Sequence, residues 1–175
     1  VDQKLPLGKD NFGNTIVWDL NNHSTPHALI CGATGSGKSV EIKNIIEYGL
    51  LAKVTEIIIF DPKYEFDSLN SNRKIRVYND ILDIEEQMAV LVTEMNERVA
   101  MKYSNTTLVI FDEFADAVAN SRKGNDLNQY VMVTTGFNAQ GRPKQKREIV
   151  GKLKSLEENL KVLLQKGRSS GYRVV

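Results

Sequence analysis

The 175-residue chain contains one cysteine and two histidines, and its net charge is only +1. The lone Cys31 rules out an internal disulfide and fits a reducing compartment, so we expect a cytoplasmic protein. No apolar run approaches the ~20 residues that a membrane-spanning helix needs, and the first residues lack a secretory signal pattern. These absences predict a soluble segment that makes no membrane contact itself, with any anchor lying on a longer parent protein.

Hydrophobic residues make up 41% of the chain and charged residues 26%, the ordinary balance of a globular protein. At this length we expect residues 1–175 to form one domain with a sizeable core. The two histidines, His23 and His27, are separated by Pro26, which disfavours a helix there. No cysteine or carboxylate set completes a metal site around them, so we expect both to be structural.

Strand and helix patterns alternate along the chain, which predicts an α/β domain with a largely parallel central sheet. An N-terminal β-hairpin, with strands at 4–8 and 15–19, is expected in the lead-in 1–26. Residues 120–150 are expected to form a polar, basic insert with one possible strand at 129–135. The other expected strands are 27–31, 56–60, 74–78, 108–111 and 172–175, and the expected helices are 40–52, 83–102 and 144–165.

Apolar residues that recur every three or four positions predict the inner faces of the three helices. These residues are Ile42, Ile45, Ile46 and Leu50, then Ile84, Met88, Leu91, Val92, Met95 and Val99, then Ile149, Leu153, Leu156, Leu160 and Leu163. Cys31 ends the expected buried strand 27–31, so we expect a packed thiol there rather than a reactive one.

The eight residues Gly32-Ala33-Thr34-Gly35-Ser36-Gly37-Lys38-Ser39 match the phosphate-binding pattern G-x-x-x-x-G-K-[ST] at every fixed position. Its glycines let successive backbone N–H groups point at a polyphosphate, and the N-terminus of the following helix adds positive potential. In this pattern Lys38 reaches the β- and γ-phosphates, and the Ser39 hydroxyl ligates Mg²⁺. With a strand before it and a helix after it, the pattern predicts a site for ATP and Mg²⁺ rather than a chance glycine-rich turn.

Asp112 and Glu113 supply the acidic half of such a site. They follow the apolar residues 108–111, and ligands bind outside the carboxyl ends of parallel strands. Asp112 is predicted to hold Mg²⁺ beside Ser39, mostly through water, and Glu113 to orient and help deprotonate the attacking water. Alone, the pair also fits a strand that meets a solvated loop; together with the glycine-rich loop it favours hydrolysis.

Asp61-Pro62-Lys63 ends another expected strand at the same edge of the sheet. Pro62 disfavours helix for Asp61 and marks a sharp exit from the strand. Two interpretations stay open: a contact near the nucleotide or to a neighbouring subunit, or a plain strand-ending turn.

These motifs, in this order, resemble the motor domain of the FtsK/SpoIIIE family of DNA translocases. The resemblance covers nearly the whole chain apart from about 120–150. It is carried by Leu5-Pro6-Leu7-Gly8-Lys9-Asp10, the loop from Ala33 to Val40, Phe60-Asp61-Pro62-Lys63, Glu94-Met95-Asn96-Glu97-Arg98, Asp112-Glu113-Phe114-Ala115-Asp116 and Gln165-Lys166-Gly167-Arg168-Ser169-Ser170-Gly171.

The resemblance implies a RecA-like P-loop ATPase core whose nucleotide loop runs from Gly32 to Val40. It implies that Arg168 acts in trans, as an arginine finger on the nucleotide of the adjacent subunit in a hexameric ring. It further implies that hydrolysis of ATP with Mg²⁺ moves double-stranded DNA through the ring, as in chromosome partition.

The chain departs from the family pattern at three places. The stretch between Ser39 and Asp112 is shorter than in the chromosome-segregating members, and the stretch between Asp112 and Arg168 is longer. The sequence stops at Val175, inside a strand that in the family is followed by a polar sensor and a further strand. We therefore expect a C-terminally truncated core, with weak or absent turnover by the chain alone.

Other functions stay open on the sequence. A coupling ATPase that feeds DNA or protein into a conjugation or secretion channel would use the same chemistry, and a nucleotide-binding assembly module would bind without turnover. A small-molecule kinase is disfavoured by the Asp112-Glu113 pair and by the lack of a lid-like arginine cluster.

Residues 121–154 include eight basic and two acidic residues, a net charge of +6, so the rest of the chain carries −5. Such a segment fits contact with nucleic-acid phosphates and equally a solvated surface. The sharper hypothesis is that Arg142, Lys144, Lys146 and Arg147 touch DNA phosphates in the pore of a ring without reading sequence.

Overall fold

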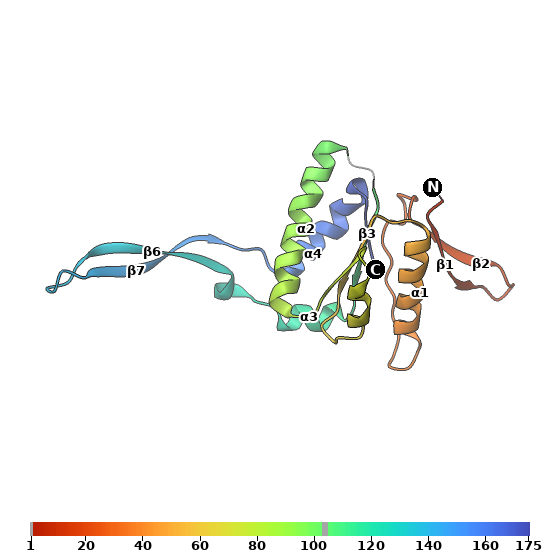
Figure 1. Ribbon diagram of the computed structural model, residues 1–175, viewed down its shortest axis with the longest axis horizontal. Helices are drawn as coiled ribbons and strands as arrows, with labels where there is room; N and C mark the ends of the chain where they lie inside the picture. Colours follow the sequence, from red (N-terminus) through yellow and green to blue (C-terminus); the bar gives the residue numbers. More distant parts are fainter. Residues whose placement is uncertain (1, 103–104) are drawn as a thin grey trace.

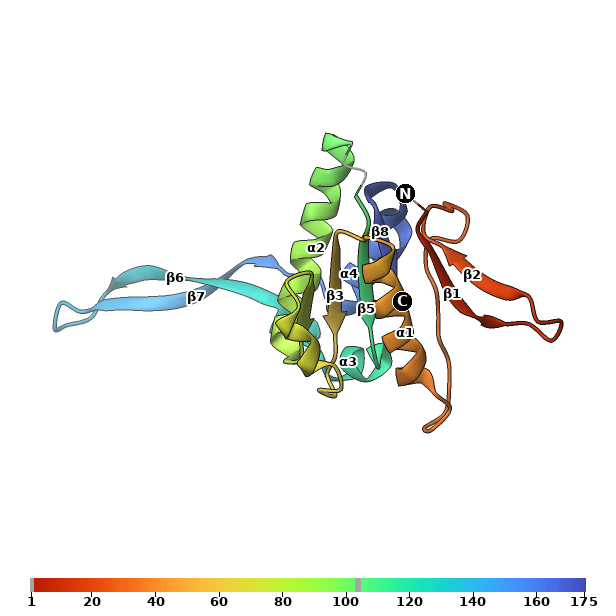
Figure 2. The ribbon, with the colours of Figure 1, turned by 45° about the vertical axis from the view of Figure 1, so that its right-hand side comes forward.

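The computed structural model describes residues 2–102 and 105–175, with a central sheet between helices and a hairpin projecting at each end (Figures 1 and 2). The chain begins with the predicted hairpin, in which β1 (Lys4–Lys9) pairs antiparallel with β2 (Thr15–Asp19). The Asp10 carboxylate closes its turn by accepting hydrogen bonds from the backbone N–H groups of Phe12 and Asn14. No helix in these two ranges has the length and apolar content to span a bilayer.

The central sheet has four parallel strands in the order β4-β3-β5-β8. β4 (Ile75–Tyr78), β3 (Glu56–Phe60) and β5 (Thr107–Phe111) match expected strands, and β8 (Tyr172–Val174) pairs with the start of β5. All five residues of β5 are buried, because helices cover both faces of a parallel sheet. The carboxyl ends of β3 and β5 lie side by side, so the residues that follow them meet at one edge.

Helices cover the two faces of this sheet (Figure 2). α1 (Lys38–Leu51) packs with the N-terminal hairpin on one face, and α2 (Ile81–Met101) and α4 (Leu156–Lys166) pack together on the other. Asp80 is the N-cap of α2, and its carboxylate accepts a hydrogen bond from the Leu82 N–H in the first turn. The short α3 (Phe114–Asn120) follows β5, so the acidic pair stands between a strand and a helix.

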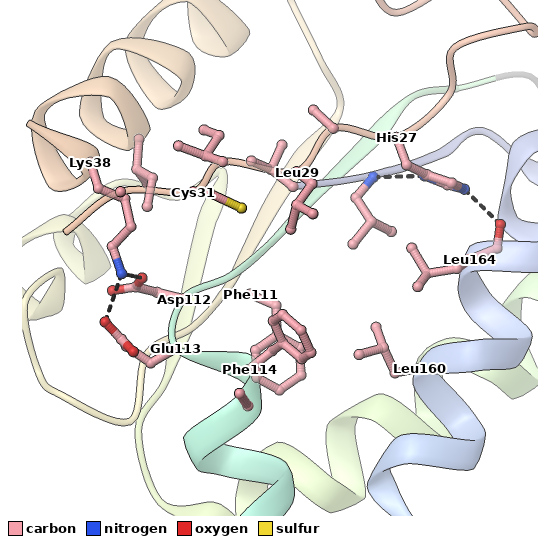
Figure 3. Close-up of a pocket in the computed structure, with 17 residues that line it drawn as sticks. His27, Leu29, Cys31, Lys38, Phe111, Asp112, Glu113, Phe114, Leu160 and Leu164 are labelled. Atoms are coloured by element: carbon pink, nitrogen blue, oxygen red, sulfur yellow. Dashed lines mark hydrogen bonds and ion pairs between the residues drawn. The ribbon is translucent and has the colours of Figure 1, made fainter. Parts of the chain in front are cut away.

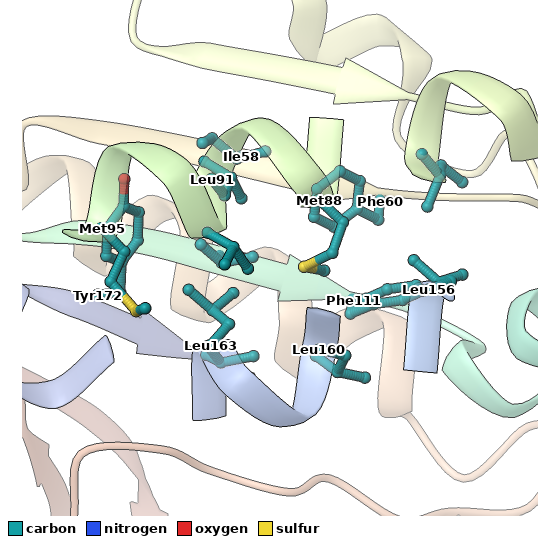
Figure 4. Close-up of a cluster of buried hydrophobic side chains, with 14 of the residues drawn as sticks. Ile58, Phe60, Met88, Leu91, Met95, Phe111, Leu156, Leu160, Leu163 and Tyr172 are labelled. Carbon is teal, nitrogen blue, oxygen red and sulfur yellow. The ribbon is translucent and has the colours of Figure 1, made fainter. Parts of the chain in front are cut away.

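Successive strand residues point to opposite faces, so β3 divides its side chains between two cores. Ile57 and Ile59 pack on the α1 side, and Ile58 and Phe60 pack on the side of α2 and α4. The second core is shown in Figure 4, where the labelled side chains are Ile58, Phe60, Met88, Leu91, Met95, Phe111, Leu156, Leu160, Leu163 and Tyr172. Burying one large apolar side chain stabilises by roughly 1.5–3 kcal/mol, so the two clusters hold the edge of the sheet in place.

The segment between α3 and α4 forms a long hairpin that projects from the body (Figure 1). β6 (Asn128–Phe137) pairs antiparallel with β7 (Pro143–Lys152), and we call this ribbon the arm. β6 includes the strand predicted at 129–135, which is confirmed. Within the described ranges, neither strand of the arm pairs with a third strand.

The helix predicted over 144–165 is wrong in its first part, where β7 lies. A capping box starts α4: Ser155 Oγ accepts from the Glu158 N–H, and the Glu158 carboxylate accepts from the Ser155 N–H. Ile149 and Leu153, predicted to face the core, are exposed. Their helical spacing was overridden by hydrogen bonding to β6, a pairing that β-branched residues such as Ile149 favour.

The strand predicted at 27–31 does not form in the described structure. β8 reaches only to Val174, and one backbone hydrogen bond, from the Ala28 N–H to Val174 O, joins the two segments. Cys31 is therefore exposed rather than packed. Val99 is a smaller error: it lies exposed in the last turn of α2, past the buried cluster.

Candidate active site

The glycine-rich loop 32–39 leads into the N-terminus of α1. Gly35 and Gly37 have φ angles of 79° and 93°, in the left-handed region that favours glycine. A Cβ atom added at Gly32 would clash with Ser36 Oγ, so a larger residue there would force the Ser36 side chain to move. Gly37 is the N-cap of α1, and the first N–H groups of a helix have no acceptor within the helix, so they are suited to binding an anion.

Asp112 and Glu113 stand at the carboxyl end of β5, facing this loop. Lys38 Nζ lies 3.0 Å from Asp112 Oδ1 and 2.6 Å from Glu113 Oε1 (Figure 3). Glu113 has a φ of 51°, a left-handed conformation that is costly for a residue other than glycine. This sharp bend ends β5, starts α3 and leaves the Glu113 side chain against Lys38.

The Asp112 carboxylate is buried, with 2% of its side chain exposed. Apart from the Lys38 ion pair, neither of its oxygens accepts a hydrogen bond within the part of the chain that is described. Buried polar atoms are normally satisfied, so a carboxylate with unused lone pairs fits a ligand for a cation. Mg²⁺ takes one or two such oxygens beside waters and phosphate oxygens, so the residues present fit the predicted ATP and Mg²⁺.

Charge pairing sets the protonation of the site. Hydrogen bonds from Lys38, and then from Lys63, hold the pKa of Glu113 below its ordinary value. The bond to Glu113, followed by the contact with Asp112, raises the pKa of Lys38. Both groups are therefore charged at neutral pH, and an ionised Glu113 can accept a proton as a general base does.

The loop after β3 is anchored by Asp61. Its buried carboxylate accepts hydrogen bonds from the backbone N–H groups of Lys63 and Phe66. Burial is the main reason that the pKa of Asp61 is raised. These bonds hold the loop against the end of β3, so the strand fixes the positions of the side chains between Pro62 and Phe66.

Two of those side chains reach the site. Lys63 Nζ lies 3.1 Å from Glu113 Oε1, and Ser39 Oγ donates to Glu65 Oε2 at 2.7 Å. Of the two interpretations of Asp61-Pro62-Lys63, this geometry supports a contact near the nucleotide. Sequence reasoning missed Glu65, because no motif separates it from other acidic loop residues; its nearness to Lys63 along the chain was the only signal.

Two cavities share Gly32, Lys38 and Glu113. The larger, about 600 Å³, lies among 27–31, α4, Phe111 and the start of α3 (Figure 3). The smaller, about 400 Å³, has Lys63 and Glu65 in its wall as well as loop residues. Those loop residues are Gly32, Ala33, Thr34, Gly35, Gly37, Lys38, Ser39 and Val40. The Lys38 ammonium and the Ser39 hydroxyl thus line the same cavity as the loop backbone, as a polyphosphate site requires.

Arg168 does not join this cluster. It lies in η3 (Gly167–Ser170), just before β8. Because β8 runs parallel to β5 and pairs with its first residues, η3 sits at the opposite edge of the sheet from Asp112. The exposed Arg168 guanidinium donates to His23 O at 3.3 Å.

A glycine-rich loop at a helix N-terminus, with its lysine on an Asp-Glu pair at the end of a parallel strand, defines a P-loop nucleotide-binding domain. The chain belongs to the FtsK/SpoIIIE family, whose family model matches residues 2–165. The family resemblance noted in the sequence is thereby confirmed.

Curated relatives agree with that assignment. The DNA translocase FtsK of Lactiplantibacillus plantarum is 33% identical over 145 residues, which cover 79% of this chain and 16% of that protein. The DNA translocase SftA of Bacillus subtilis is 34% identical over 134 residues, 73% of this chain and 14% of that protein. The chain therefore spans less than a fifth of the length of these relatives.

Solved structures share the fold. The pCW3 conjugation coupling protein TcpA, in a monomer form with ATPgS, matches with a TM-score of 0.70 at 21% identity, over 99% of this chain and 47% of that one. The cytoplasmic domain of the type VII secretion ATPase EccC of Thermomonospora curvata matches with a TM-score of 0.67 at 17% identity, over 99% and 21%. The predicted α/β P-loop core with an N-terminal hairpin is confirmed.

Proposed function

We propose that this domain binds ATP with Mg²⁺, hydrolyses it within a ring, and couples hydrolysis to movement of double-stranded DNA. The observation that carries the proposal is the meeting of Lys38 with Asp112 and Glu113 at the end of β5. Family membership supports DNA as the moved substrate, since the relatives compared above are named DNA translocases. A cytoplasmic location and a hexameric ring belong to the same proposal.

Each group of the site has a distinct task in this proposal. The backbone of 32–39 and Lys38 hold the phosphates, and Ser39 and Asp112 hold Mg²⁺, which when bound neutralises phosphate charge. Glu113, kept ionised by two lysines, accepts a proton from the attacking water. Arg168 is assigned to the nucleotide of an adjacent subunit, because it lies at the far edge of its own sheet.

Nucleotide binding by the chain is the first test. Mg²⁺ with ATP or ADP should raise the melting temperature, because a ligand that binds only the folded state stabilises it, by about 2.7 kcal/mol at a hundredfold excess over Kd. Lys38→Ala should remove the shift, whereas Lys43→Ala, an exposed lysine on the same helix, should keep it. Calorimetry that finds no binding at millimolar nucleotide would contradict the proposal.

The coupling to DNA needs the complete protein. Duplex DNA should stimulate its ATP turnover. Lys38→Ala should abolish both the basal rate and the DNA-stimulated rate. Turnover that is intact yet indifferent to DNA would instead favour a channel ATPase that moves protein.

A further inference from the structure

One face of the arm consists largely of apolar side chains that nothing in the described ranges covers. Residues paired across an antiparallel ribbon point to the same side, and alternate pairs share a face. The pairs on this face are Tyr130 with Ile149, Met132 with Arg147, Thr134 with Gln145, and Phe137 with Pro143. The exposed fractions are 43% for Tyr130, 56% for Met132, 68% for Phe137 and 61% for Ile149.

The opposite face of the arm is different. It carries Lys144, Lys146 and Glu148, together with Val131 and Val133, by the same register. The four basic residues expected to touch DNA are therefore not equivalent. The lysines point away from the apolar face, and Arg147 lies on it, with its guanidinium 5.1 Å from the centre of the Tyr130 ring.

The apolar face needs a partner of matching chemistry. A two-stranded ribbon alone is marginally stable in water, and a row of large exposed apolar residues marks a protein contact more than a phosphate contact. Arg147 is the charged member of the pairs on this face, and the residues outside 121–154 carry a net charge of −5. A complementary surface would therefore be apolar and acidic.

The outer side of α2 has that character. Its exposed residues recur every three or four positions and form a stripe of Leu82, Glu86, Val90, Thr93, Glu97 and Met101. α2 contains no lysine, and its one arginine, Arg98, is partly buried and donates to Thr107 Oγ1. The lengths agree as well: 21 helical residues span ~31 Å, and strands of 10 residues span ~33 Å.

We propose that the apolar face of the arm docks on the α2 stripe of a second copy of this chain. Both views show the arm extending away from its own α2 (Figures 1 and 2), so the stripe it meets belongs to a neighbour. Tyr130, Met132, Phe137 and Ile149 lie against Leu82 and Val90, with Arg147 near Glu86 or Glu97. A donor arm and an acceptor helix at different places on one chain make a head-to-tail contact, the kind that closes into rings.

Sedimentation equilibrium of the chain tests this docking. The wild-type chain should self-associate. The variant Met132→Ser/Phe137→Ser/Ile149→Ser should have an association constant lower by about tenfold or more, because buried anchor residues dominate the affinity of an interface. The matched control, Val131→Ser/Val133→Ser, removes apolar groups from the opposite face and should associate as wild type. All variants should keep Mg²⁺-dependent ATP binding, because the arm contributes no residue to either core cluster.

A charge exchange gives a second test, which still applies if the serine substitutions unfold the arm. Glu86→Arg/Glu97→Arg on α2 should weaken self-association, Arg147→Glu on the arm should do the same, and combining them should restore part of it. Duplex DNA binding, measured by fluorescence anisotropy, should be unaffected by the serine variant.

Three results would overturn the docking. They are a wild-type chain that stays monomeric at every concentration, equal association of the serine variant and its control, and loss of DNA binding by the serine variant with association intact. The last result would make the apolar face a nucleic-acid surface. None of them bears on ATP binding, so failure here is distinct from failure of the proposed function.

Discussion

At the scale of single residues, one carboxylate of the candidate site is held by two lysines. Glu113 contacts Lys38 at 2.6 Å and Lys63 at 3.1 Å. Lys38 comes from the phosphate loop and Lys63 from the loop after β3, so two separate segments set the charge and position of Glu113. We therefore expect Lys63 to act through Glu113, as a positioning residue.

Lys63→Met should raise the pKa of Glu113, because it removes the second of two cations that lower it. Protonation would then disable the base at higher pH, so the acidic limb of the profile of kcat/KM against pH should move to higher pH. Lys63→Arg keeps a cation and should leave the limb near its wild-type position. An unmoved limb in Lys63→Met, with turnover measurable, would rule out this role.

His27 predicts a pH dependence of stability. Its Nδ1 accepts from the Val174 N–H at 3.1 Å, and its Nε2 lies 2.8 Å from Leu164 O (Figure 3). Burial lowers the pKa of His27 from its ordinary value of 6.5, so the unfolded chain takes up a proton first. Its stabilising effect is complete above pH 6.5 and is lost as pH falls toward the folded value.

The melting temperature should therefore drop as pH falls below 6.5, and His27→Gln should flatten that part of the curve. His23→Gln, at an exposed position, should keep the wild-type slope. Equal slopes in all three proteins would show that another group causes the dependence.

At the scale of elements, a packed body and a solvated arm divide the chain. Both hydrophobic clusters are built from elements other than β6 and β7. Asn128 and Lys152, at the base of the arm, are cross-strand partners, and Leu127 and Leu156 on either side are buried in the body. The arm therefore leaves and rejoins the body at nearly one point.

Replacing residues 129–151 with a short Gly-Ser turn should leave the body folded. The free energy of unfolding should change by no more than about 1 kcal/mol, because a loop closed between adjacent ends costs little. Mg²⁺-dependent ATP binding, measured by calorimetry, should persist. Limited proteolysis of the intact chain should cut the arm first, and loss of nucleotide binding on shortening would show that the arm supports the site.

At the scale of the whole molecule, the sheet separates the phosphate-loop site from the proposed arginine finger. Lys38, Asp112 and Glu113 gather at the carboxyl edge, and Arg168 lies at the amino edge. The buried Arg173 donates to Arg168 O at 3.2 Å, which fixes the backbone there. Since Arg168 lies at the edge opposite the acidic pair of its own sheet, the proposed role of this arginine requires a second copy of the chain.

In the complete protein, Glu113→Gln and Arg168→Ala should each bind ATP and lose hydrolysis, the second by roughly 10³–10⁵-fold. Mixing the two should restore part of the activity, because some interfaces then join an intact Glu113 to an intact Arg168. Steady-state ATPase of the mixture measures this. No recovery in rings shown to be mixed would remove the trans role.

The local parts of this protein could be predicted from its sequence. The loop 32–39, the apolar run before Asp112 and the helix spacing of α2 each lie within a short segment. Glycine at positive φ, continuous apolar strands and residues every three or four positions are local requirements, so the sequence by itself determined the P-loop, the acidic edge and the parallel sheet.

Contacts between distant segments were decided only by the tertiary structure. Glu65 on Ser39, Lys63 on Glu113 and Arg168 at the opposite edge depend on strand order, which no local pattern contains. The same holds for β7. Its apolar residues have helical spacing, but its backbone groups are hydrogen-bonded to β6, and the capping box at Ser155 starts α4 only at Leu156. A backbone group can be paired only once, and which partner reaches it is a property of the whole fold.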